Sequence, residues 1–416
     1  MRNKSTFIIL LDAFRHDYIS QEFTPFLFKT SLKGYYIKKI KPSFGFCERT
    51  EFFTGLKPNE SGYFSAIGFN PKNSQYKNKT LLNFLSFTEK LFSDKIVITI
   101  KGKKYSLKFL FRKIILKFIF KSKKLNPYFI PYKFLKYFSL TEDAFDHFSP
   151  NAFKSDSLYD FLLRNNLSVS NNSYTSLSSK SFINDLERLN DVSESFKKNQ
   201  KDIYFIYISS PDKYGHLYGP NSSLLKEELF KMDTELESFK NNVNQYQENN
   251  FIYIGDHGMI EVKHEIDCGS ILLRILTKQG LLPDKDFIYF LDSTMFRIWF
   301  LNKAEPNIKL DILNNDSFLT HGFFPNEDFL IENNLPIDRK YGDILWIANP
   351  GVLVFPDFFN SSPAKGMHGY DPNMNESKGL FISNGPNIVP ETYEEKDLSS
   401  LFSIQKKLIN KFHTIN

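Results

Sequence analysis

The chain has 416 residues, of which 41% are hydrophobic and 24% charged, a balance typical of a globular protein with a large core. Its formal charge is +6, and two cysteines, Cys47 and Cys268, are too few for a disulfide framework. No apolar run approaches the roughly 18 residues that a membrane span needs. We therefore expect a protein of the reducing cytoplasm, and we interpret its apolar N-terminal run as a buried strand, not a signal peptide.

Three short runs rich in Ile, Phe and Tyr predict buried parallel strands, at residues 6–14, 202–212 and 249–258. Each run brings an aspartate to its C-terminal end, where open α/β sheets bind their ligands. Helical patterns between the runs, such as the one after Asn221, supply the crossovers of a parallel sheet. The pattern predicts an α/β fold with a mostly parallel central sheet flanked by helices, in a single domain over residues 1–416.

Two insertions are expected to cap the carboxyl edge of this sheet, at residues 95–195 and 260–350. Residues 168–181, rich in Ser and Asn, indicate a loop inside the first insertion. Residues 101–124 predict a basic helix, in which Lys and Arg recur at helical spacing between apolar residues. The charged positions that define this spacing are Lys108, Arg112, Lys117 and Lys121.

The positive charge of the chain is concentrated in the first insertion. Residues 95–141 contain 13 Lys or Arg and no Asp or Glu, which leaves 40 basic against 47 acidic residues elsewhere. Apolar residues between the basic ones favour an anionic membrane surface over nucleic acid, because a phosphate backbone needs no apolar face. A solvated basic face is the alternative, and under the membrane hypothesis the protein is peripheral at the inner membrane surface.

Acidic and histidine residues follow the predicted strands and recur near the C-terminus. Carboxylate and imidazole groups together suit two adjacent sites for zinc. Each motif is common by itself, and the structural alternative is that these side chains serve as caps and hydrogen-bond partners. The candidate metal ligands are Asp12, Asp212, His216, Asp256, His257 and His368.

The order of these motifs resembles the alkaline phosphatase superfamily, and within it the nucleotide pyrophosphatase/phosphodiesterase branch. The likeness is carried by a strand-end Asp, the "TG" of residues 54–55, "PDKYGHLYGP", "DHGM" and "MHGYDP". It implies that Asp212, His216 and His368 hold one metal, and that Asp12, Asp256 and His257 hold the other. Two divalent ions, zinc or manganese, would clamp a phosphoryl group during in-line displacement.

The expected nucleophile is missing from this pattern. In the family a Thr, Ser or modified Cys stands nine residues before the Thr of the "TG" pair, and counting back from Thr54 gives Gly45. Cys47, near a helix N-terminus that lowers a thiol pKa, is the preferred substitute. Ser43, Thr50 and a metal-bound hydroxide are the alternatives. Arg49 is assigned to a phosphate oxygen, with an exposed helix position as its alternative.

The resemblance implies a two-metal phosphoester hydrolase, with phosphodiesters or pyrophosphates preferred to monoesters. Other activities of the superfamily, as a phosphatase, sulfatase or phosphotransferase, are the first alternatives. A second alternative is a non-catalytic relative that only binds metals and a phosphorylated ligand. The expected substrate is a phosphorylated small molecule or a lipid-linked phosphate.

Overall fold

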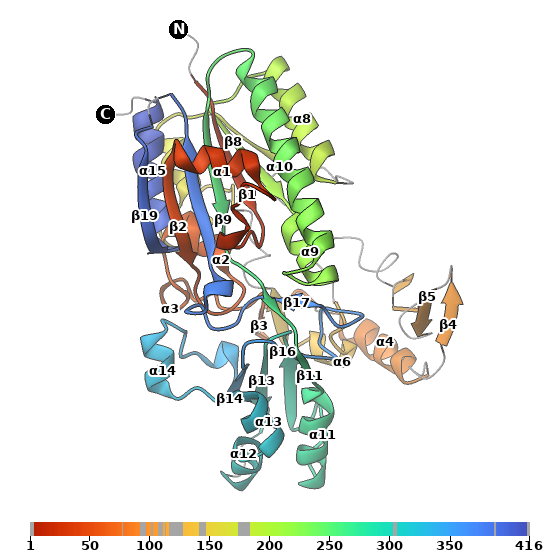
Figure 1. Ribbon diagram of the computed structural model, residues 1–416. Coiled ribbons are helices and arrows are strands. Elements are labelled where there is room, and N and C mark those ends of the chain that lie inside the picture. The colour runs from red at the N-terminus through yellow and green to blue at the C-terminus, as the bar shows by residue number, and fades with distance from the viewer. Residues whose placement is uncertain are drawn as a thin grey trace.

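The computed structural model describes residues 4–76, 78–91, 97–100, 103–106, 111–112, 114–115, 128–140, 147–173, 184–302, 306–386 and 388–413. Figure 1 shows a large central sheet with helices on both sides and, below it, a smaller sheet with its own helices. The two termini lie together at the end of the large sheet that is remote from the smaller one (Figure 1).

The central sheet has seven strands and is mostly parallel, which confirms the predicted fold class. Parallel pairing joins β1 to β8 and β9, β7 to β8, and β19 to β2, whereas β18 runs antiparallel to both of its neighbours. In spatial order the strands are β19 (Glu391–Asp397), β2 (Tyr35–Lys41), β18 (Gly379–Asn384), β9 (Asn250–Gly255), β1 (Thr6–Leu11), β8 (Ile203–Ile208) and β7 (Val169–Ser173).

Helices cover both faces of this sheet, so its central strands are apolar throughout. Phe7, Ile9 and Leu11 of β1 pack on α1 (Pro25–Leu32), α8 (Asp185–Lys198) and α10 (Ser223–Asn244). Ile8 and Leu10 point to the other face, toward α2 (Glu48–Thr54), α7 (Leu158–Arg164) and α15 (Ser400–His413). This alternation, with a period of two, positions the C-terminal end of β1 rigidly between two helical layers.

The second predicted insertion, 260–350, contains a four-stranded antiparallel sheet in the order β12-β13-β15-β14. Its core is built around Trp299 and Trp346, both fully buried. The strands are β12 (Phe287–Leu291), β13 (Met295–Phe300), β14 (Gly322–Phe323) and β15 (Ile344–Ala348), with α11 (Cys268–Lys278), α12 (Pro306–Leu313), α13 (Asp316–His321) and α14 (Glu327–Glu332). Two short strand pairs connect it to the rest: β10 (Ile260–Glu261) with β17 (Gly366–Met367), and β11 (His264–Ile266) with β16 (Val352–Val354).

Residues 58–140 add further elements, several of which lie against this second core. Ile67, Leu82 and Tyr132 belong to the same buried cluster as Trp299. The elements are α3 (Pro58–Ser61), β3 (Ile67–Phe69), α4 (Lys79–Leu91), β4 (Val97–Ile100), β5 (Lys103–Ser106), α6 (Tyr132–Leu135) and β6 (Phe138–Leu140). Short 3₁₀ turns occur at His16–Tyr18, Arg339–Tyr341 and Asn375–Ser377.

The predicted basic helix over 101–124 is wrong at its beginning, because Lys103–Ser106 form a strand that pairs with β4. Arg112 is buried, forms an ion pair with Glu89 and donates to the backbone oxygens of Tyr128 and Ile130. A partner 23 residues away therefore neutralises a charge that was predicted to face outward. The other charged positions of that pattern, Lys108, Lys117 and Lys121, lie outside the described residues.

The boundaries of the first insertion also differ from the expectation. α7, β7 and the beginning of α8, which fall within 95–195, belong to the layers of the central sheet. Part of the predicted loop, 169–173, is the edge strand β7, and 174–181 lies outside the described residues. No helix in the described part of the chain is both long and apolar enough to cross a membrane.

Candidate metal centre

The six predicted ligands meet at the carboxyl edge of the central sheet. Asp12 follows β1 directly, and Asp256 and His257 follow β9. Asp212 and His216 lie one turn apart on α9 (Ser210–Tyr218), the helix that begins just after β8, so they share a helix face. His368 comes from the loop after β17. Because these strands are parallel neighbours, their C-terminal ends bring side chains that are far apart in sequence into one place.

The side chains fall into two groups, Asp212 with His216 and His368, and Asp12 with Asp256 and His257. Within each group the potential ligand atoms lie within 4.8 Å of one another. These are the same two groups that the resemblance implies. The rings of His257 and His368 stack with centroids 4.1 Å apart, so the two groups are immediate neighbours.

Two of the histidines are oriented by backbone oxygens. Nδ1 of His216 lies 2.7 Å from the oxygen of Gly366, and Nδ1 of His257 lies 2.9 Å from that of Gly258. In each ring Nε2 faces a carboxylate, at 3.0 Å from Oδ1 of Asp212 for His216 and at 3.2 Å from Oδ1 of Asp12 for His257. This arrangement leaves Nε2 to act as the ligand atom.

Burial and mutual charge perturb the titration of these groups. Burial raises the pKa of Asp256 to about 6. Burial acts on Asp12 in the same direction, but its hydrogen bond with His257 and the positive charge of that ring hold the pKa of Asp12 well below its usual value. Burial and the charges of His257 and His216 lower the pKa of His368 well below that of an ordinary histidine. Clustered groups with displaced pKa values are typical of functional sites.

The residues fit a pair of divalent ions. Nδ1 of His368 is buried and has no hydrogen-bond partner in the structure, which is costly for a polar atom unless a ligand orders the ring. Three carboxylates and three imidazoles form the mixed oxygen and nitrogen set that zinc accepts.

The segment expected to carry the nucleophile cannot hold a side chain at residue 45. Gly45 has φ +101°, a conformation that favours glycine, and an added Cβ would overlap the backbone oxygen of Phe64. The backbone conformation at this position therefore requires a residue without a side chain.

The three residues proposed as alternative nucleophiles differ in where their side chains lie. Cys47 is buried at the residue before α2, is not among the described residues that line the pocket, and interacts electrostatically with Lys340 and Tyr341. The Ser43 backbone N–H donates to Glu51, and Thr50 is buried within α2. This placement does not favour attack by Cys47, Ser43 or Thr50, and the identity of the nucleophile stays a prediction.

Arg49, in contrast, lies in the pocket with the ligand groups. Its guanidinium stands over the ring of Tyr207, and the hydroxyl of Tyr207 donates to Asp12. The positive charge of Arg49 contributes to the lowered pKa of Asp12, and it opposes the rise that burial causes in the pKa of Asp256. Arg49 is thus placed to meet an anionic ligand beside the metal groups.

The pocket has a volume of about 400 Å³ and lies between the central sheet and the second core. Residues 260–350 were expected to cap this edge of the sheet, but the residues of the second wall were not predicted from the sequence. Glu48, which heads α2, was overlooked although it lies in the segment searched for a nucleophile, and no local pattern distinguishes the wall residues. Beyond the predicted ligands and Arg49, the lining residues are Phe46, Glu48, Ala66, Tyr128, Tyr207, Asp292, Ser293, Phe359, Asn360 and Met367.

A family model, described as type I phosphodiesterase / nucleotide pyrophosphatase, matches residues 6–371. The chain therefore belongs to this family, as the order of its motifs suggests. It is 24% identical over 227 residues to the venom phosphodiesterase CdcPDE of Crotalus durissus collilineatus, a match that covers 50% of this chain and 25% of the relative. It is 22% identical over 217 residues to ectonucleotide pyrophosphatase/phosphodiesterase family member 3 of Mus musculus, a match that covers 48% of this chain and 23% of the relative. The matched segments thus span about a quarter of these relatives.

Solved structures of the same family share the fold. Murine ectonucleotide pyrophosphatase/phosphodiesterase 5, in a form described as inactive and in complex with AMP, superposes with a TM-score of 0.64 at 17% identity, covering 98% of this chain and 95% of the other. The human protein of the same name gives a TM-score of 0.62 at 16% identity, with the same coverage.

Proposed function

We propose that this protein is a two-metal hydrolase of phosphodiester or pyrophosphate bonds. The observation that carries the proposal is the placing of two three-residue ligand groups side by side in one pocket with Arg49. Membership of the phosphodiesterase family supports the same reaction class. The pocket is far larger than a single phosphoryl group, which favours diesters over monoesters.

The proposed ions are zinc, held by Asp212, His216 and His368 on one side and by Asp12, Asp256 and His257 on the other. When bound, such ions supply positive charge to the phosphoryl oxygens and lower the pKa of water. Arg49 would neutralise a further phosphate oxygen, and Tyr207 would hold Asp12 in place through its hydroxyl.

Water is the nucleophile that the geometry favours, because Gly45 has no side chain and Cys47 is not among the described lining residues. The water oxygen forms a bond to phosphorus while the bond from phosphorus to the leaving oxygen breaks. One proton of that water is lost on attack, and the leaving oxygen is protonated when it departs as an alcohol. Such a single displacement inverts the configuration at phosphorus, whereas attack by Cys47 followed by hydrolysis would retain it.

For the substrate we propose a nucleotide-type phosphodiester or pyrophosphate. The murine relative crystallised with AMP supports this class, and the aromatic rings of Tyr128 and Phe359 in the pocket wall suit a planar base. The predicted contact of 95–141 with an anionic membrane, and a lipid-linked substrate with it, gain no support from the described residues, because Arg112 is buried and paired with Glu89.

The decisive test measures metal content and hydrolysis of an aryl phosphodiester by the purified protein. We expect about two zinc ions per chain, and turnover of the diester in preference to the monoester. His216→Ala and His257→Ala should each remove one ion and lower the rate by at least about 100-fold. His264→Ala, at an exposed histidine in β11, should change neither quantity.

The result that would contradict the proposal is a protein without bound divalent metal, or one that hydrolyses neither type of ester after metal is added. Binding of metal and AMP without turnover would instead favour the non-catalytic alternative. The observation that supports this alternative is the absence of a side chain at Gly45. The stereochemical course with a chiral phosphorothioate diester separates water from Cys47. Inversion, together with near-normal turnover by Cys47→Ala, supports water.

A further inference from the structure

His368 differs from the other two histidines of the site in what its Nδ1 contacts. His216 and His257 are each oriented by a backbone oxygen that accepts from Nδ1. Nδ1 of His368 is buried and has no hydrogen-bond partner in the structure, while its Nε2 faces Oδ1 of Asp212 at 3.7 Å. A metal-binding histidine ordinarily donates its second ring N–H to an oxygen, which fixes the tautomer and orients the ring. His368 therefore needs an acceptor on its Nδ1 side.

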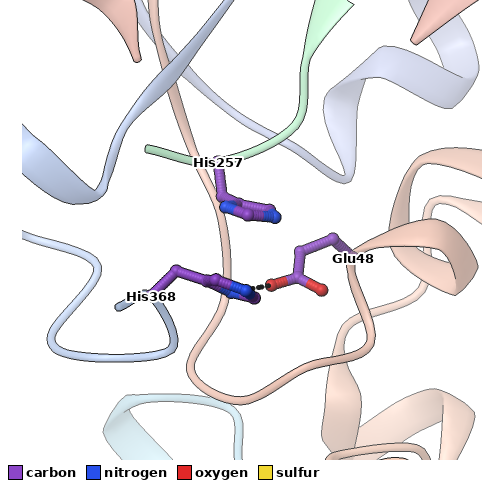
Figure 2. A group of neighbouring side chains, drawn as sticks. All are labelled: Glu48, His257 and His368. Carbon is purple, nitrogen blue, oxygen red and sulfur yellow. Dashed lines mark ion pairs between the residues drawn. The ribbon is translucent and has the colours of Figure 1, made fainter. Parts of the chain in front are cut away.

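The carboxylate of Glu48 lies on that side of the ring. Its Oε1 lies 4.0 Å from Nδ1 of His368, and Glu48 is the first residue of α2. Figure 2 shows the carboxylate in line with the His368 ring, whereas the ring of His257 stacks on its face. The face of the His368 ring is thus occupied by another ring, and the carboxylate approaches its edge, where an N–H can donate.

Glu48, His257 and His368 also offer potential ligand atoms that lie within 4.8 Å of one another, so they could form a third metal group. Such a third group would have to share its histidines with the other two, since His257 and His368 each belong to one of them. For His257 the second ring nitrogen is already bonded to the oxygen of Gly258. A role for Glu48 that leaves both histidines to the two main groups is more consistent with these contacts.

We propose that Glu48 is a positioning residue that accepts the Nδ1–H of His368 and thereby directs Nε2 to the ion held with Asp212 and His216. This inference rests on the proposed function, because it assumes that those residues hold a metal. It assigns a role to the segment that carries the nucleophile in the family. Here α2 begins with a carboxylate that orients a ligand, while the position of Gly45 before the helix has no room for a side chain.

The test compares the wild-type protein with Glu48→Ala and Glu48→Gln, each stripped of metal and titrated with zinc against a chromophoric chelator. Glu48→Ala should weaken one of the two zinc sites by roughly 10- to 100-fold and leave the other unchanged. Glu48→Gln should lose less, because its amide oxygen can still accept the Nδ1–H. The matched control is Glu51→Gln, one turn along the same helix, whose carboxylate accepts from Ser43 outside the pocket.

A second readout separates positioning from a general structural role. In zinc-loaded protein labelled with ¹⁵N-histidine, long-range ¹H–¹⁵N spectra should show His368 bound through Nε2 and protonated at Nδ1. This signature should remain in Glu48→Gln and Glu51→Gln and be lost in Glu48→Ala. Since Glu48→Gln preserves the shape of the side chain, it keeps the test valid if the alanine variant does not fold.

Two zinc sites of wild-type affinity in Glu48→Ala would overturn this inference and leave the proposed function intact. Coordination of His368 through Nδ1 in the wild-type protein would also overturn it. A wild-type protein that binds no zinc would overturn the proposed function and this inference together, so the two failures are distinguishable.

Discussion

At residue 45 the backbone conformation and the surrounding atoms both demand glycine. The φ of +101° is strained for any other residue, and a Cβ would overlap the oxygen of Phe64. We expect Gly45→Ala to lower the free energy of unfolding by about 1–3 kcal/mol or more, measured by urea denaturation.

Gly62 provides the matched control for this strain. It has φ +72°, but no atom lies within 4 Å of the Cβ it would gain. Gly62→Ala should therefore lower the free energy of unfolding only by the cost of positive φ, about 1 kcal/mol. Equal losses at the two glycines would show that the space around Gly45 is open, and the side chain of a nucleophile would then be admissible there.

Glu51 gives a prediction about pH at the same scale. Burial raises its pKa to about 7 from an ordinary 4.5. Between these values the folded protein holds a proton that the unfolded chain has lost, so stability falls as pH rises from about 4.5 to about 7. Glu51→Gln should remove this loss and be more stable than wild type at pH 8, by on the order of 2 kcal/mol, but similar at pH 4.5.

Thermal unfolding at the two pH values measures this effect. Glu60→Gln, at an exposed position of the chain, serves as the control. A Glu51→Gln variant that is less stable than wild type at both pH values would show that Glu51 is held as an anion.

At the scale of elements, one buried ion pair ties the second sheet to the pocket. Arg297 of β13 is fully buried and donates to Asp292, to Oγ of Ser65 and to the backbone oxygen of Ile67. Asp292 also lines the pocket. We expect Arg297→Met to lower the free energy of unfolding by about 3–5 kcal/mol, because it leaves the buried Asp292 without its partner.

The comparison for this pair is Arg164→Met, which removes an exposed ion pair with Asp156 and should change stability little. Replacing Asp292 by Leu as well should recover part of the loss, since no charge is then left uncompensated. If Arg297→Met unfolds at the same urea concentration as Arg164→Met, the buried pair does not hold the two parts together.

At the scale of the whole molecule, the site depends on several parts of the fold at once. Asp12 and Asp256 come from the central sheet, His368 from the loop after β17, and Asn360 from the segment that follows β16. Metal that binds only this assembled arrangement must stabilise the folded state, by about 2.7 kcal/mol at a concentration 100 times the dissociation constant.

Removing metal should therefore lower the melting temperature by several degrees, and restoring zinc should recover it. The shift is measured by differential scanning fluorimetry with and without a chelator. His216→Ala should show a smaller shift than wild type, and His264→Ala an equal one. A melting temperature that does not respond to chelator or zinc in any of the three proteins would contradict a metal centre at this site.

The sequence by itself determined the three central strands and the positions of the six candidate ligands. Runs such as "FIILL" are apolar at every position because both faces of the sheet are covered, and this pattern is readable without knowing the neighbours. Asp12 and Asp256 end such runs, and Asp212 and His216 are spaced by one helical turn. Local geometry was sufficient for these positions, and parallel pairing then brought them together.

Only the tertiary structure decided which residues near the start of α2 face the pocket. Cys47 and Glu48 are adjacent, and spacing places both at the same helix start, yet only Glu48 is among the described residues that line the pocket. The way in which α2 docks on the sheet sets this choice. Likewise, Arg112 was predicted to be exposed, but it is buried in an ion pair with Glu89. The antiparallel second sheet arises from strand pairings that no local pattern encodes. Burial and strand pairing depend on contacts between distant segments, and for that reason the sequence alone did not determine them.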